Sequence, residues 1–112
     1  MVAYEPIETT PKAKPNQMVY LVRSVDTAGV EAYKIGRGGK NRVRDLQTGN
    51  QFDLEVLAQS SFMPWNRAKG IEAGLHIRYS YVQIVRRNGS ESEWFWLDTS
   101  EVEYLTGLIS VL

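Results

Sequence analysis

The sequence predicts a small α+β domain, in which a three-stranded antiparallel sheet is flanked by helices. Two observations predict this class. The first is a pair of compact β-rich runs, at 18–22 and 31–36, separated by a turn-rich break that is typical of a β-hairpin. The second is a pair of later segments, 64–82 and 100–112, in which apolar residues recur every three or four positions, as on one face of a helix. Helices packed on an antiparallel sheet are the simplest layering of such elements.

The length of 112 residues is enough for one domain with a hydrophobic core but not for two. Residues 1–17 contain Pro6, Pro11 and Pro15 and no apolar period, so we expect a flexible N-terminal arm before a single domain at 18–112. The elements expected in this domain, in order, are strands at 18–22 and 31–36, a helix at 41–48, a strand at 52–62, a helix at 64–82, a short extended segment at 93–97 and a helix at 100–112.

Local signals predict the ends of the helices. Asn41 is a suitable cap for the first helix and Gly49 a suitable stop. Pro64 suits the first turn of the second helix, and Ser100 with Glu103 forms a capping-box pattern at the start of the last one. The apolar stripe of the second helix consists of Ala68, Ile71, Leu75, Tyr79 and Val82.

The composition excludes several classes of protein. No apolar run approaches membrane length and no signal peptide opens the chain, so we expect a cytoplasmic protein without a membrane partner. The lack of cysteine excludes disulfides and thiolate chemistry and fits a reducing compartment. The net charge is zero, but basic residues crowd into 34–44 while the last part of the chain is acidic. This segregation is compatible with a local basic face for nucleic acid.

A glycine-rich bend carries the concentrated basic charge. Gly36, Gly38 and Gly39 permit a sharp turn and a close approach of a ligand to the backbone. A solvated turn between a strand and a helix explains the stretch on its own, and a binding site for a phosphate-bearing partner is the alternative. The cations of this stretch are Lys34, Arg37, Lys40, Arg42 and Arg44.

Several familiar sites are disfavoured because residues that they need are missing. A single histidine and no cysteine argue against a structural zinc site. The bend lacks the Gly-Lys-Ser/Thr ending of a phosphate-binding loop. No nucleophile-elbow sequence supports a Ser-His-Asp triad built on His76.

Glu72 interrupts the apolar stripe of the second expected helix, one turn from His76. A carboxylate at the edge of a buried face needs a partner, because burying the charge alone is costly. Glu72 therefore pairs with Arg67 or Lys69 at the helix margin or stays in water, or it binds a hard cation such as Mg²⁺ together with water and substrate phosphate oxygens. His76 on the same face is more often a core-edge residue than a catalytic one.

Tyr20 and Tyr33 lie on adjacent strands of the expected hairpin. They form either a packing pair across the strands or two phenols that point into a shared cleft beside the basic bend. In the second case, the positive charge of Lys34 and Arg42 would lower the pKa of a phenol. Such a phenol can act as a general base toward a water molecule.

Taken in order along the chain, these residues resemble the GIY-YIG nuclease superfamily, over roughly residues 18–97. The likeness is greatest to a phage-type branch whose second signature reads Lys-Ile-Gly. The stretches that carry the resemblance are Val19-Tyr20-Leu21, Tyr33-Lys34-Ile35-Gly36, Arg42-Val43-Arg44, Leu46-Gln47-Thr48-Gly49, Ile71-Glu72-Ala73-Gly74-Leu75-His76 and Glu93-Trp94-Phe95.

The resemblance implies a metal-dependent endonuclease or nickase that hydrolyses DNA phosphodiester bonds, with Mg²⁺ or Mn²⁺ as its cofactor. It assigns Tyr20 to proton removal, Glu72 to the metal, and Arg42 (or its neighbour Arg44) to stabilising the charge on the phosphate. Lys34 stands where the family has its second tyrosine and can hold a water or a phosphate oxygen. The remaining candidates are Tyr33 and His76 for catalysis, and Arg37, Lys40 and Arg44 for substrate binding.

The alternative function, from another class, is a GIY-YIG-like domain that binds nucleic acid or protein without cutting it. We expect DNA as the partner in the first case. Related nucleases gain DNA affinity from extra domains, whereas here a short arm is added to the domain. We therefore expect a homodimer or a partner domain to supply the additional affinity.

Overall fold

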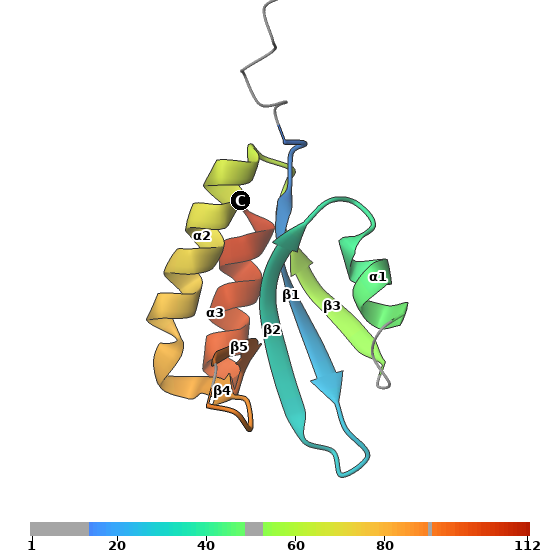
Figure 1. Ribbon diagram of the computed structural model, residues 1–112, viewed down its shortest axis with the longest axis vertical. Coiled ribbons are helices and arrows are strands. Elements are labelled where there is room, and N and C mark those ends of the chain that lie inside the picture. Colours follow the sequence, from blue (N-terminus) through green and yellow to red (C-terminus); the bar gives the residue numbers. More distant parts are fainter. Residues whose placement is uncertain (1–13, 49–52, 90) are drawn as a thin grey trace, which may run out of the picture.

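A computed structural model describes residues 14–48, 53–89 and 91–112 of the chain. Figure 1 shows the arrangement of its helices and strands. In chain order they are β1 (Met18–Val25), β2 (Glu31–Gly38), α1 (Arg42–Thr48), β3 (Leu54–Gln59), α2 (Trp65–Arg78), a 3₁₀ turn (Ser80–Val82), β4 (Gln83–Val85), β5 (Glu91–Phe95) and α3 (Thr99–Ser110).

The α+β class is confirmed, but the sheet has five strands where three were expected. The strands are all antiparallel and lie in the order β3-β1-β2-β5-β4. The extra strand β4 arises because α2 ends at Arg78 and does not continue to residue 82. The chain then turns through a 3₁₀ segment, and Gln83–Val85 pairs with β5. Strand β5 joins the sheet through the pairs Tyr33↔Phe95 and Lys34↔Trp94.

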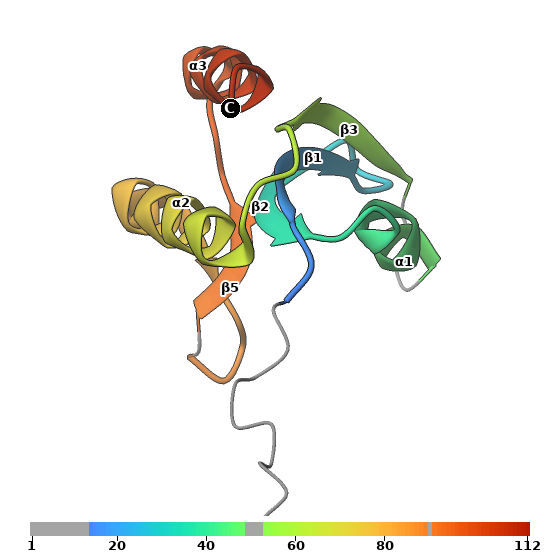
Figure 2. The same ribbon diagram turned by 90° about the horizontal axis from the view of Figure 1, so that it is seen from above.

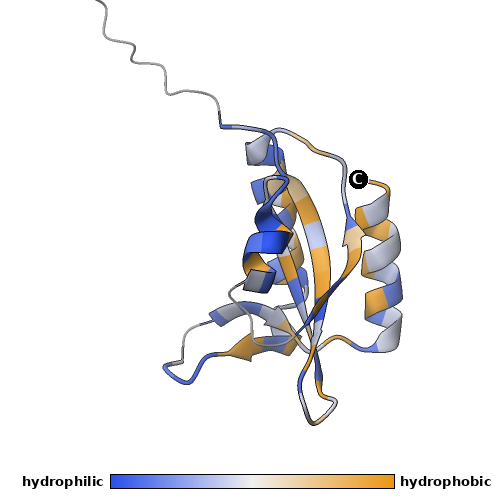
Figure 3. Ribbon diagram, turned by 90° about the vertical axis from the view of Figure 1, so that its right-hand side faces the viewer, coloured by the Kyte–Doolittle hydropathy of each residue, from blue (hydrophilic) through white to orange (hydrophobic). Residues whose placement is uncertain are grey.

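The two faces of the sheet are covered by different helices. Figure 2 shows α2 and α3 on one side of the central strands and α1 on the other. Strand β1 is buried on both faces, because its odd residues Val19 and Leu21 point toward α2 and α3 while Tyr20 and Val22 point toward α1. This explains why β1 reads as a continuous apolar run and not as an alternating one. Figure 3 shows orange, hydrophobic stretches on the strands of the sheet, interrupted by paler and blue ones.

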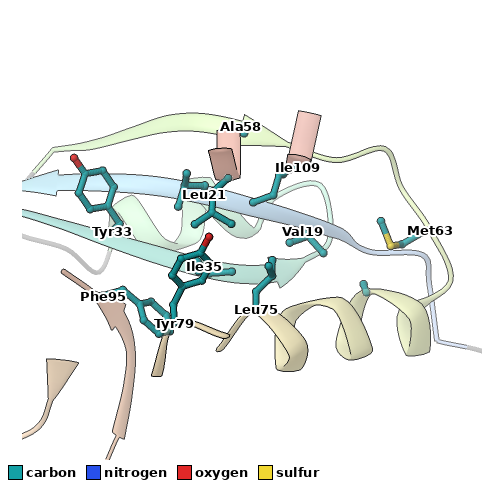
Figure 4. Packing of buried hydrophobic residues seen from close by; sticks show 12 residues of the cluster. Val19, Leu21, Tyr33, Ile35, Ala58, Met63, Leu75, Tyr79, Phe95 and Ile109 are labelled. Atoms are coloured by element: carbon teal, nitrogen blue, oxygen red, sulfur yellow. The ribbon is translucent and has the colours of Figure 1, made fainter. Parts of the chain in front are cut away.

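The main hydrophobic core lies between the sheet and the helices α2 and α3. Figure 4 shows its side chains meeting from both strands and helices. Phe95, Leu105 and Ile109 are fully buried there. A smaller cluster on the opposite face holds Met18, Tyr20 and Val22 against partly buried residues of α1 and against Trp94. The buried members of the main core are Val19, Leu21, Tyr33, Ile35, Ala58, Met63, Ala68, Leu75, Tyr79, Phe95, Leu105 and Ile109.

The ends of α2 and α3 differ from the sequence predictions. Tyr79, expected within the second helix, is the C-cap of α2. The capping box of α3 is formed by Asp98 and Glu101, not by Ser100 and Glu103. Both pairs have the spacing of a capping box, and the helix begins at the earlier one. Ser100 Oγ instead donates a hydrogen bond to Asp98 Oδ1 at 2.8 Å.

The last part of the expected N-terminal arm contacts the domain. Gln17 forms a two-way backbone bridge with Met63, with both N···O distances at 2.8 Å. The Lys14 ammonium lies 4.3 Å from the centre of the Trp65 ring. Residues 1–13 of the arm, like the expected helix stop Gly49, lie outside the described residues. In the described part of the chain, no helix has the length and apolar character to cross a membrane.

Candidate functional site

Two glycines of β2 leave gaps that side chains from other elements occupy. Gly36 lies opposite Tyr20 in the β1–β2 ladder. A Cβ atom at Gly36 would lie 2.5 Å from Tyr20 Oη, so the phenol lies against the strand where no side chain stands. A Cβ atom at Gly38 would lie 2.4 Å from Cγ of Arg42, which begins α1. The glycines thus let the Tyr20 phenol and the aliphatic part of the Arg42 side chain lie close against β2.

The Tyr20 phenol is buried, and its Oη has no hydrogen-bond partner among the described residues. Burial raises the pKa of Tyr20, and the nearby Arg42 charge only partly opposes this rise. The negative charges of Glu93 and Glu72 raise the pKa of Tyr20 further. The expectation that nearby cations lower the pKa of this phenol is therefore wrong for the ligand-free chain, because desolvation exceeds the effect of the positive charge.

Glu72 reaches this region from the middle of α2. Its side chain is only 16% exposed, and Oε1 lies 3.6 Å from Nε of Arg37 at the end of β2. The expected partners Arg67 and Lys69 are exposed, and Lys69 lies over the Trp65 ring instead. Burial raises the pKa of Glu72 and the charge of Glu93 adds to the rise, while His76, Arg37 and Lys34 oppose it. The chain therefore holds a carboxylate whose ionised form is disfavoured.

This burial leads to a prediction about stability. In Glu72→Gln, the ionised carboxylate is replaced by a neutral group of the same shape, and we expect unfolding at a temperature about 2–4 °C higher at pH 7.5. The pKa of Glu72 is higher in the folded chain than in the unfolded one. Ionisation of Glu72 therefore lowers the free energy of unfolding as the pH rises from the unfolded-state pKa through the folded-state pKa. Below pH 4.5, the ordinary pKa of this carboxyl group, Glu72 is protonated in both states, so the higher unfolding temperature of Glu72→Gln should disappear.

Thermal unfolding of both proteins between pH 4 and 8 would measure this difference. Glu103→Gln on the exposed side of α3 is the matched control and should leave the unfolding temperature nearly unchanged. A Glu72→Gln protein that is less stable than the parent at pH 7.5 would show that the pairing with Arg37 outweighs desolvation.

Lys34 and Glu93 form a close ion pair beside Tyr20 and Glu72. Lys34 Nζ lies 2.7 Å from Glu93 Oε2, and the Lys34 side chain is only 9% exposed. Burial disfavours ionisation of Glu93, but the hydrogen bond and the charge of Lys34 outweigh it and lower the pKa of Glu93. Lys34 stands opposite Trp94 in the β2–β5 ladder, and its ammonium lies 5.9 Å from the centre of the Trp94 ring.

We name the residues brought together here the hairpin cluster; they are Tyr20, Lys34, Arg37, Arg42, Glu72 and Glu93. Sequence reasoning selected five of them and gave no role to Glu93. The signal that could have identified Glu93 was an acidic residue next to two aromatic residues in an extended segment, together with a lysine, Lys34, in the second expected strand. A buried lysine requires a carboxylate partner.

His76 lies beside the hairpin cluster in a structural arrangement. Its Nε2 lies 2.7 Å from the carbonyl oxygen of Ile35, and a carbonyl only accepts, so Nε2 carries the proton and donates. Ile35 is one residue beyond the last β2 residue that pairs with β5. The imidazole also stands edge-on to Phe95, with ring centres 5.1 Å apart. His76 thus joins α2 to the edge of β2.

Tyr33 lies on the other face of the sheet, away from the hairpin cluster. Its ring is part of the main core (Figure 4), and its hydroxyl donates a hydrogen bond to Glu31 Oε2 at 2.8 Å. The expected shared cleft with Tyr20 does not form, because Tyr20 lies opposite Gly36 while Tyr33 lies opposite Arg23. Residues 33 and 36 of one strand face opposite sides.

The candidate substrate-binding residues lie around the start of α1. Lys40 lies just before this short helix, Arg42 and Arg44 lie on it, and all three residues are exposed. Arg37 is partly buried, and its Nη1 donates a hydrogen bond to Gln17 Oε1 at 2.7 Å. An exposed group of cations therefore adjoins a buried phenol and carboxylate, an arrangement that can bind an anion at the edge of the site.

The residues of the cluster fit a metal held by one protein carboxylate. In the described ranges, no three or more His, Cys, Asp or Glu side chains come together closely enough to hold an ion. Mg²⁺ also binds through one or two carboxylates, with water and substrate phosphate supplying the other oxygens. Glu72 suits that arrangement, because its buried charge is incompletely balanced by Arg37 at 3.6 Å.

The fold and this cluster define a small α+β domain with a charged site on its central hairpin. Residues 17–110 match the family model of the T5orf172 domain, and the chain belongs to that family. T5orf172 is a phage-associated domain in the neighbourhood of the GIY-YIG and HNH nucleases. Comparison with curated proteins and with solved structures gives no match.

Proposed function

We propose that this chain is a GIY-YIG-type endonuclease or nickase that hydrolyses DNA phosphodiester bonds with one divalent metal ion, Mg²⁺ or Mn²⁺. The observation that carries the proposal is the buried Tyr20 phenol, which has no hydrogen-bond partner among the described residues and whose pKa responds to the charges of both Arg42 and Glu72. A base, a cation and a metal-binding carboxylate are the groups that this reaction needs. Membership of the T5orf172 family supports a nuclease-like or DNA-binding module.

In this proposal, Lys40 and Arg44 bind the DNA backbone, while the exposed Arg42 and the buried Tyr20 and Glu72 carry the chemistry. Arg42 contacts the scissile phosphate and stabilises its growing negative charge, as a donor already in place before the reaction. Lys40 and Arg44 bind phosphates near it, which makes binding salt-dependent. Glu72 would hold the metal, which when bound polarises the phosphate and stabilises the leaving oxygen.

In this scheme, Tyr20 first loses its phenolic proton to solvent, and the resulting phenolate then takes a proton from the attacking water. Its Oη lies against Gly36 and has no competing hydrogen bond in the described part of the chain. The negative charge of Glu72 contributes to the raised pKa of Tyr20, so neutralisation of that charge in the loaded site would ease loss of the phenolic proton. Lys34 stays paired with Glu93 and keeps a positive charge beside the reacting groups.

A supercoiled plasmid incubated with Mg²⁺ or Mn²⁺ tests the proposed function. Wild-type protein is expected to nick the plasmid, and both Arg42→Ala and Glu72→Ala should reduce the rate at least about 100-fold. Arg86→Ala and Glu103→Ala, which remove exposed charges elsewhere, are the matched controls and should nick at the parent rate. Equal nicking by all five proteins would indicate a contaminating nuclease.

A second function is favoured by one specific observation, the raised pKa of Tyr20. A phenol that stays protonated cannot act as a base, and such a domain would bind DNA or protein without cutting. The plasmid assay separates the two functions when it is combined with a DNA-binding measurement. Binding that is lost in Arg42→Ala, without nicking by any variant, would support the non-catalytic module.

A further inference from the structure

Two ammonium groups lie over one aromatic ring at the start of α2. Lys14 Nζ is 4.3 Å from the centre of the Trp65 ring, and Lys69 Nζ, one helical turn beyond Trp65, is 5.7 Å from it. The indole is partly buried and both lysines are exposed. Because the face of an indole attracts cations, the ring holds both ammonium groups in place. We name Lys14, Trp65 and Lys69 the Trp65 patch.

No carboxylate balances these two charges in the described part of the chain. The ion pairs found there involve other cations, and neither Lys14 nor Lys69 takes part in one. Segment 60–71 contains no Asp or Glu. The first acidic residue after it is Glu72, which lies against Arg37 instead. Like charges repel each other within about 10 Å, the Debye length at 0.1 M salt, so an anion bound between the two ammonium groups would relieve this repulsion.

The Trp65 patch is connected to the hairpin cluster through the start of β1. Gln17 forms its backbone bridge with Met63, two residues before Trp65. The side chain of Gln17 accepts a hydrogen bond from Arg37 at 2.7 Å, near the end of β2. Figures 1 and 2 show α2 and α1 on either side of this end of β2. The patch and the cations of α1 therefore flank the proposed site.

We propose that the Trp65 patch is a phosphate-binding site, which holds the DNA backbone on the side of the proposed active site opposite to α1. This inference rests on the proposed function, because it takes the anion to be the DNA that lies in that site. Exposed, unpaired ammonium groups match the charge of the DNA backbone and bind it without regard to sequence. The patch would supply part of the affinity that was expected from a partner domain or a second copy.

DNA binding in EDTA, measured by fluorescence anisotropy with a labelled duplex, tests this inference without cleavage. Lys14→Gln combined with Lys69→Gln should weaken binding about tenfold at 0.1 M salt and reduce the slope of log affinity against log salt by about 2. Arg86→Gln combined with Arg87→Gln is the matched control, because it removes two exposed cations between β4 and β5. Equal weakening in both double variants would overturn the inference, since net charge alone would then explain it.

The role of the ring is tested separately from that of the two charges. Trp65→Leu keeps both lysines but loses the ring that holds them, and it should weaken DNA binding about threefold. Trp65→Phe keeps an aromatic face and should remain near wild type. Thermal unfolding of each variant shows whether it is folded, and the exposed lysines can be replaced without disturbing the core. Wild-type affinity in folded Trp65→Leu would overturn the patch as an organised site and leave two solvated lysines.

Plasmid nicking separates this inference from the proposed function. The lysine double variant should need more DNA for its half-maximal rate but reach the parent rate at saturating DNA. A chain whose DNA binding depends on both lysines but that never nicks would reject the nuclease and leave the phosphate site standing. A chain that nicks, and whose lysine double variant binds DNA like the parent, would reject the patch alone. Absence of DNA binding by the wild-type chain would overturn both.

Discussion

Gly36→Ala is expected to reduce DNA nicking at least about 100-fold while the chain remains folded. The added Cβ would lie 2.5 Å from Oη and 2.6 Å from Cζ of Tyr20, much closer than any normal contact. The Tyr20 ring is rigid and fully buried, so it cannot move aside without displacing its neighbours. The proposed base would then lose its position against Gly36, and overpacking should cost about 1–3 kcal/mol of stability.

Single-turnover nicking and urea unfolding of the same protein would measure both effects of Gly36→Ala. Gly39→Ala in the following loop is the matched control, because a Cβ at Gly39 has no atom within 4 Å. The control should retain wild-type nicking and stability. If Gly36→Ala nicks DNA at the wild-type rate, the position of the Tyr20 phenol is not important for the reaction, and Tyr20 is not the base.

Phe95→Ala is expected to lower the free energy of unfolding by about 3–5 kcal/mol, a large part of the roughly 5–15 kcal/mol that a domain has. Phe95 is fully buried in the main core, pairs with Tyr33 across the β2–β5 ladder and packs against the His76 ring at 5.1 Å. Its removal leaves a cavity at the junction of β5, β2 and α2. The support of the His76 hydrogen bond to Ile35 is lost as well.

Equilibrium unfolding in urea would measure this loss of stability. Trp96→Ala is a demanding control, since it removes a larger aromatic side chain from the next position along the chain. Trp96 is 49% exposed, and its substitution should cost less than about 1 kcal/mol. A similar loss in both variants would mean that hydrophobic area alone, and not burial in the core, determines the effect.

The sequence was sufficient to predict the class of fold and its first half. The hairpin, the helix near 41–48 and the following strand all form close to their expected positions, because each has a local signal in turn residues or apolar spacing. Strand β4 was missed because a three-residue strand has too few residues to show alternation. Tyr79 and Val82 fit the apolar spacing of the second helix, so the helix was expected to continue to residue 82. In the structure α2 ends at Arg78, and the chain then passes through a cap and a 3₁₀ segment.

Sequence reasoning located the proposed site better through its ordered motifs than through single residues. The charges of Arg42 and Glu72 both act on the pKa of Tyr20, and the roles that the family resemblance implies for these three residues stay a prediction. The partner of Glu72 could not be predicted, because Arg37 lies 35 positions earlier and no local spacing connects them. Tyr33 was grouped with Tyr20 without regard to the alternation of side chains along a strand, which places it on the opposite face.

The hairpin cluster draws on almost the whole length of the domain. Tyr20 comes from the first strand and Glu93 from the last, with α1 and α2 contributing between them. Contacts between such distant residues form late in folding, because the chain loses entropy in closing the long loop before the contacts stabilise it. A growing chain on the ribosome has no complete site until β5 has emerged and docked beside β2. For a protein with the proposed activity, the ability to cut DNA would therefore appear only when the fold is finished.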